Sequence, residues 1–126
     1  MMPNNIDMAK LRKQLDYIQR GGRVQRMHMQ PTIHAQNVAA HSFGVAWWCW
    51  LLSDEKPSAN LLMAALGHDL AEGHTGDIPA PTKHKLNIHA VLEGWEQDIE
   101  DKHDIPVFEL TEDEVTVLKL SDNFEL

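Results

Sequence analysis

The stretch that says most about this 126-residue chain is residues 68–83, which read HDLAEGHTGDIPAPTK. An imidazole and a carboxylate stand side by side at its start, in His68 and Asp69, and two more acidic residues follow, Glu72 and Asp77. Apolar residues at helical spacing precede it, whereas glycines and prolines follow Glu72 and are typical of a loop. On one helix, positions i and i+4 share a face, and position i+1 lies about 100° round. We therefore expect His68, Asp69 and Glu72 to gather at a helix end.

Helical periodicity also dominates the rest of the sequence. Five helices are expected, over residues 5–22, 37–52, 58–73, 88–99 and 111–122. Asn5, Asn37 and Ser58 are candidate N-caps, and Thr111 opens a capping-box pattern. Residues 23–36 show no period and are interpreted as a connecting segment, and no β-alternating segment competes. The fold class is therefore all-α, a bundle of about five helices in a single domain over residues 1–126.

Composition restricts the partners and the compartment. Nineteen acidic against eleven basic residues give a formal net charge of −8, which argues against binding to a nucleic acid polymer or to an anionic membrane. The single Cys49 excludes an internal disulfide and a cysteine-based zinc cluster, and no secretion signal is evident. No apolar run approaches the roughly 20 residues that span a bilayer. A soluble protein of the reducing cytoplasm is expected.

Two further polar residues fall where core residues are expected. His41 lies on the main apolar stripe of the second predicted helix, and Asp122 lies on the inward stripe of the fifth. Taken singly, each is more often a hydrogen-bonded core histidine or a solvated aspartate. Together with His68 and Asp69 they are costly to bury unless something shared compensates them, and a metal does so. Two nitrogen and two oxygen ligands suit one divalent ion of manganese, cobalt, nickel, iron or zinc.

These residues resemble a known family. The order His41, then His68-Asp69, then Asp122 is similar to the H…HD…D signature of HD-domain phosphohydrolases, whose four motif residues bind one metal in a helical bundle. Residues 68–83 closely resemble the H-D-x-x-E-x-x-T-G-D-x-P-x-P-x-K pattern of the 5′-deoxynucleotidase branch. NVAAHS at residues 37–42 and KLSD at residues 119–122 resemble the same branch, so the likeness spans about residues 15–126.

The resemblance implies roles at further positions, which phosphate-ester cleavage also requires. Glu72 and Asp77 are the acidic residues nearest the predicted ligands in sequence, so one can activate water while the other protonates the leaving oxygen; the sequence leaves open which does which. Arg26 and Lys83 match family positions that resemble phosphate clamps. The alternative interpretation is that Arg26 and Lys83 are solvated charges on the protein surface. The family pattern tends to have an aromatic residue after the arginine, whereas this chain has Met27, which puts sugar and base selectivity in question.

The function predicted first is metal-dependent hydrolysis of deoxynucleoside 5′-monophosphates to deoxynucleoside and phosphate, in a bacterium or in a phage-infected bacterial host. One alternative is a deoxynucleoside triphosphate triphosphohydrolase, for example on dATP, that releases triphosphate. A second is a catalytically silent HD module that binds a nucleotide or a partner.

The other histidines, the aromatic stripe and the end of the sequence carry no predicted catalytic role. The remaining histidines lack matching partners and argue for one metal rather than two, namely His28, His34, His74, His84, His89 and His103. The aromatic stripe of Phe43, Trp47 and Trp50 is interpreted as core or as a homo-oligomer face. No Gly, Pro or polar tail closes the last predicted helix before Leu126, which is typical of a sequence truncated at its C-terminus.

Overall fold

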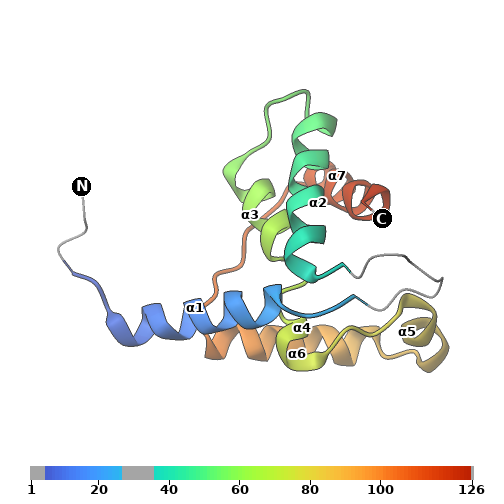
Figure 1. Ribbon diagram of the computed structural model, residues 1–126. Helices are drawn as coiled ribbons and strands as arrows, with labels where there is room; N and C mark the ends of the chain where they lie inside the picture. Colours follow the sequence, from blue (N-terminus) through green and yellow to red (C-terminus); the bar gives the residue numbers. More distant parts are fainter. Residues whose placement is uncertain (1–4, 27–35, 126) are drawn as a thin grey trace.

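A computed structural model describes residues 5–26 and 36–125 of the chain. Within these residues the structure is helical, which confirms the all-α fold class (Figure 1). The helices are α1 (Met8–Gly22), α2 (Val38–Leu52), α3 (Ala59–Gly67), α4 (Glu72–Thr75), α5 (Ala80–Leu86), α6 (His89–Lys102) and α7 (Glu112–Phe124). The predicted caps Asn37 and Ser58 and the capping box of Thr111 are confirmed, whereas α1 is capped by Asp7 instead of Asn5.

Three helices form the upper part of the molecule in Figure 1, where α2 packs against both α3 and α7. Their shared core consists of Val45, Cys49, Leu61 and Ala65, with Leu118 of α7 packed against it. The starts of α3 and α7 are also joined, because the Ser58 hydroxyl donates to the Glu114 carboxylate. This core holds α2, the end of α3 and α7 together, and these three elements carry the predicted metal ligands.

A second core joins α1 to α6 and to the turn after α3, in the lower part of Figure 1. It is built from Tyr17, Ala71 and Ile99. Gly21 lies so close to the backbone of Leu70 that a Cβ there would collide with it. Because only glycine permits that approach, α1 is seated directly on the turn that leads into α4.

The third predicted helix is wrong in one respect. It ends at Gly67, so His68, Asp69 and Glu72 do not share one continuous helix. Backbone bonds of the i to i+3 type replace the α-helical pattern here: Leu70 N donates to the Gly67 carbonyl, and Glu72 N donates to the Asp69 carbonyl. This tighter winding turns the chain sharply after the histidine. The predicted loop after Glu72 is also partly helical, because α4 and α5 interrupt it.

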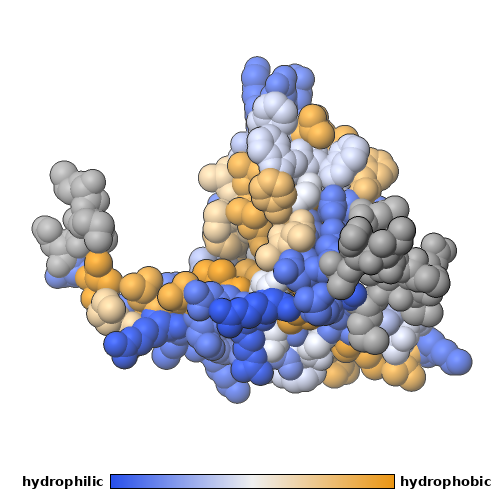
Figure 2. All heavy atoms as spheres, in the orientation of Figure 1, coloured by the Kyte–Doolittle hydropathy of each residue, from blue (hydrophilic) through white to orange (hydrophobic). Residues whose placement is uncertain are grey.

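Two apolar faces are largely exposed. The stripe of α1, represented by Leu11 and Leu15, is 45% and 49% exposed, and Phe43 and Trp47 of α2 are 64% and 52% exposed. Figure 2 shows apolar surface along the projecting part of α1 and on the adjoining side of the body. The interpretation of Phe43 and Trp47 as core residues is therefore wrong, whereas the homo-oligomer face stays a prediction. Among the described residues, no helix is both long and apolar enough to span a membrane.

Candidate metal centre

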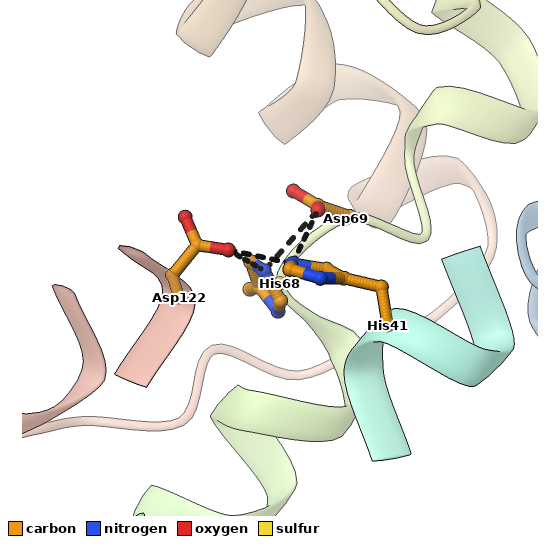
Figure 3. A group of neighbouring side chains, drawn as sticks. All are labelled: His41, His68, Asp69 and Asp122. Carbon is orange, nitrogen blue, oxygen red and sulfur yellow. Dashed lines mark hydrogen bonds and ion pairs between the residues drawn. The ribbon is translucent and has the colours of Figure 1, made fainter. Parts of the chain in front are cut away.

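Four side chains from three parts of the chain point toward one another (Figure 3). His41 comes from the first turn of α2, His68 and Asp69 follow α3 directly, and Asp122 comes from the last turns of α7. One ligand atom from each lies within 4.8 Å of the others. The Nε2 atom of His68 is 3.2 Å from Asp69 Oδ2 and 3.1 Å from Asp122 Oδ1. The structure thus brings together all four predicted ligands.

The histidine of α2 is fully buried and is held on both sides of its ring. Its Nε2 lies 2.7 Å from Asp122 Oδ1, and its Nδ1 lies 2.8 Å from Arg26 Nη1. A guanidinium group can only donate, so Nδ1 of His41 accepts and the ring proton is on Nε2, where it donates to Asp122. This hydrogen-bond pattern fixes the orientation of His41.

The other histidine is held in the opposite sense. Its Nδ1 lies 2.7 Å from the carbonyl oxygen of Ala65, one turn earlier in the chain. A carbonyl only accepts, so Nδ1 of His68 carries a proton, and Nε2 faces the two carboxylates. Metal-binding histidines usually bind the metal through one ring nitrogen while the other donates to such a carbonyl.

The two carboxylates create a strongly negative point between the rings. Burial alone would lower the pKa of His68, but hydrogen bonds and charge from Asp122 and Asp69 outweigh it and raise that pKa to about 10. Burial alone would raise the pKa of Asp122, yet the hydrogen bonds from His41 and His68 hold it well below its usual range. The centre therefore stabilises positive charge between Nε2 of His68 and the carboxylate oxygens.

A third acidic residue, Glu72, has a raised pKa and interacts electrostatically with Asp69 of this centre. Burial, followed by the charges of Asp69 and Asp77, raises the pKa of Glu72 to about 8, and Lys83 only partly offsets this. Its Oε2 atom is buried and has no hydrogen-bond partner among the described residues. Glu72 is thus protonated in part at neutral pH, close enough to Asp77 and Lys83 to feel their charges.

Arg26, which the sequence predicts as a phosphate contact, lies next to the centre and contacts His41. Its Nη1 donates to His41 Nδ1 and also, at 2.7 Å, to Gln36 Oε1. Gln36 in turn donates from Nε2 to Glu125 Oε1 at 2.9 Å. Gln36 and Glu125 were not predicted from the sequence. The only signal for Gln36 was its position directly before the Asn37 cap, and Glu125 had none.

The remaining histidines that the structure describes do not join the centre. The rings of His74 and His103 contact each other and lie beside Tyr17, and His84 and His89 form a separate exposed pair. Within residues 5–26 and 36–125, no second group of three or more candidate ligands comes together. His28, His34 and Met27 lie outside the described residues.

The donor set suits a resident divalent metal. Two imidazole nitrogens and two carboxylate oxygens converge, and the carboxylates supply the negative charge that a divalent ion requires. Residues His41, His68, Asp69 and Asp122 would hold it. The family comparison agrees with this geometry: residues 14–125 match the model of the HD domain, and the chain belongs to this family within the HD-domain phosphohydrolase superfamily.

A particular relative was also found. The dATP triphosphohydrolase of Salmonella phage PMBT28 is 34% identical to this chain over 90 residues, which cover 62% of this chain and 46% of that protein. The chain thus matches less than half the length of this relative. No solved structure matches the chain.

Proposed function

We propose that this chain is a metal-dependent phosphohydrolase that acts on deoxynucleotides. The observation that carries the proposal is the convergence of His41, His68, Asp69 and Asp122 beside Glu72, a buried carboxyl with a raised pKa. When bound, the metal supplies Lewis-acid polarisation of a phosphate oxygen and activation of water. A raised pKa of a carboxyl group such as Glu72, next to candidate metal ligands, is typical of catalytic sites. A module that only binds a nucleotide or a partner does not require it, so we rank that alternative last.

Glu72 is the proposed proton carrier. In the metal-free protein, burial and the charges of Asp69 and Asp77 raise its pKa to about 8, and burial, the first cause, also favours the protonated carboxyl that can deliver a proton to the oxygen that leaves phosphorus. Asp77 influences the charge of Glu72 and is the second proposed acid–base group. If Glu72 donates the proton to the leaving oxygen, Asp77 is the group that orients or deprotonates the attacking water.

Arg26 and Lys83 are the proposed phosphate contacts. Among residues 5–26 and 36–125, the side-chain hydrogen bonds of Arg26 are made by Nη1, and we assign the edge formed by Nε and Nη2 to a bidentate contact with an anion. Lys83, on α5, offers a point charge near Glu72. Both are partly buried, which strengthens their attraction to phosphate relative to fully solvated cations.

The substrate is proposed to be a deoxynucleoside triphosphate, with triphosphate as the product. The support is the likeness to a phage dATP triphosphohydrolase. The second candidate is the deoxynucleoside 5′-monophosphate, and the small number of cations at the centre favours it. Arg26 and Lys83 suffice for one phosphate group, whereas a triphosphate needs more positive charge.

One experiment separates these candidates. The protein is incubated with manganese or cobalt and a panel of deoxy- and ribonucleoside mono- and triphosphates, and the products are resolved by anion-exchange chromatography. Inorganic triphosphate from a deoxynucleoside triphosphate is the expected result. Orthophosphate from monophosphates would support the second candidate, and no cleavage by metal-loaded protein would favour the silent module.

A homo-oligomer also remains a prediction. Phe43 and Trp47 contact each other edge to face and are both exposed, which is typical of a face that packs against another subunit. Light scattering coupled to size exclusion measures the mass in solution, and a single-chain mass would contradict the prediction.

A further inference from the structure

The side chains of Arg26, Gln36 and Glu125 form a hydrogen-bonded chain that ends on His41 of the candidate metal centre. Gln36 stands in the middle: its Oε1 accepts from Arg26 Nη1 at 2.7 Å, and its Nε2 donates to Glu125 Oε1 at 2.9 Å. The two contacts agree on the orientation of the amide, with oxygen toward the cation and nitrogen toward the anion. Both ends of the amide are therefore matched to their partners.

The backbone also brings Arg26 and Gln36 together. Arg26 N donates to the Gln36 carbonyl at 2.8 Å, and Val38 N donates to the Val24 carbonyl at 2.9 Å. These bonds pair the chain after α1 with the chain before α2. Side chains on such paired backbones keep a fixed relation to one another, so Gln36 is well placed to control its neighbour.

Glu125 is anchored independently. It caps the end of α7, where its backbone N donates to the Ser121 carbonyl at 3.1 Å. Its carboxylate fills the space over Gly44 of α2, where any Cβ would collide with it. Gly44 therefore keeps open the space that the Glu125 carboxylate needs to reach Gln36.

We propose that Gln36, anchored by Glu125, is a positioning residue that fixes the guanidinium of Arg26 for binding the phosphate chain of the substrate. This inference rests on the proposed function. The contact of Nη1 with Gln36 Oε1 does not depend on which ring nitrogen of His41 carries the proton, so it sets the guanidinium plane, with its Nε and Nη2 edge, with or without metal on His41. A flexible arginine loses rotamer freedom on binding, so fixing it in advance increases anion affinity.

The first test measures binding of inorganic triphosphate to cobalt-loaded protein by calorimetry. Gln36→Leu and Arg26→Met should each weaken binding by about tenfold, the size of one lost hydrogen bond to a charged group. Because Gln36 acts only through Arg26, the double variant should bind no more weakly than Arg26→Met alone. Additive losses, or a Gln36→Leu affinity within twofold of wild type, would overturn the proposal. The exposed Arg12→Met, on α1, is the control for lost positive charge.

A charge exchange gives the second test. Gln36→Glu still accepts from Arg26 but places a carboxylate against Glu125, so it should weaken triphosphate binding. Glu125→Gln should bind as wild type does, because its amide oxygen still accepts from Gln36 Nε2. The pair Gln36→Glu with Glu125→Gln restores a donor to the new carboxylate and should recover an affinity within about threefold of wild type. A pair as impaired as Gln36→Glu alone would contradict the role.

A third measurement needs no ligand and so separates this inference from the proposed function. In metal-free protein, the melting temperatures of Gln36→Leu, Arg26→Met and the double variant form a mutant cycle. Coupling between the two residues is expected, with the double variant no less stable than the weaker single one. Independent effects would overturn the positioning role. Wild-type protein that binds metal but no triphosphate would contradict the proposed function, while the cycle still decides the role of Gln36.

Discussion

The two sides of the candidate metal centre hold their histidines by opposite means. On the α3 side, His68 donates from Nδ1 to the carbonyl of Ala65, so its Nε2 is directed at the carboxylates. On the α2 side, His41 accepts at Nδ1 from Arg26, so its Nε2 carries the proton and donates to Asp122. A side-chain substitution does not remove the backbone carbonyl of Ala65, whereas Arg26 is a side chain that we also propose to bind phosphate.

This difference shows which histidine is prepared for a metal. A metal held at Nε2 requires the ring proton on Nδ1, and His68 already has it there. For His41 the same arrangement would set an N–H of the ring against an N–H of Arg26, and two donors repel. The α3 side is therefore preset, and the α2 side is coupled to the residue proposed to bind phosphate.

The largest expected effect comes from removing a ligand shared by both sides. Asp122→Ala should abolish metal binding and activity, because its Oδ1 is the oxygen that lies near both histidines. His68→Ala should do the same. Metal per chain is measured by mass spectrometry after gel filtration, with about one ion expected in wild type. Full occupancy in both variants would show that the metal is bound elsewhere.

The next largest effect is on the rate of hydrolysis and concerns Glu72, in the segment that follows α3. Glu72→Gln should retain the metal but reduce turnover by about 10²-fold or more, the usual contribution of a positioned acid–base group. The measurement is the rate with saturating substrate, together with metal content. Asp98→Asn, which removes an exposed carboxylate on α6, is the control and should turn over normally. A Glu72→Gln rate near that of wild type would remove this residue from the mechanism.

A smaller effect sharpens the contrast between the two histidines. Arg26→Met frees Nδ1 of His41, so we expect cobalt to bind about 2- to 10-fold more tightly, the equivalent of one ordinary hydrogen bond. The same variant should bind phosphate compounds more weakly. Calorimetric titration of metal-free protein with cobalt measures the first quantity. Weaker or unchanged cobalt affinity would mean that the contact with Arg26 does not oppose the metal.

The smallest effect is on stability and depends on pH. Burial and the charges of Asp69 and Asp77 raise the pKa of Glu72 to about 8, above its unfolded value of about 4.5. A raised pKa contributes stability that is fully present below the unfolded value and is lost as pH rises through the folded one. In chelator-treated protein, Glu72→Gln should therefore gain in melting temperature over wild type between pH 6 and pH 9. A constant difference across that range would contradict the raised pKa.

The sequence by itself determined the longer helices and singled out the candidate ligands. Helical spacing and local caps such as Asn37, Ser58 and Thr111 act within a few residues, so the pattern of side chains suffices to identify them. His41 and Asp122 were identified because polar residues on apolar stripes are conspicuous, and His68 and Asp69 because an imidazole and a carboxylate stand side by side at a predicted helix end. Glycines and prolines, by contrast, led to a loop being predicted where α4 and α5 form.

Only the tertiary structure decided which contacts orient those ligands. The turn that follows α3 packs against α1 where Gly21 approaches the backbone of Leu70, a contact between residues far apart in the chain. The same is true of Glu125, which reaches Gln36 across 89 positions, and of Arg26, which lies on His41. A sequence pattern reports local preference and burial, whereas the direction of a hydrogen bond between distant residues depends on how the helices pack.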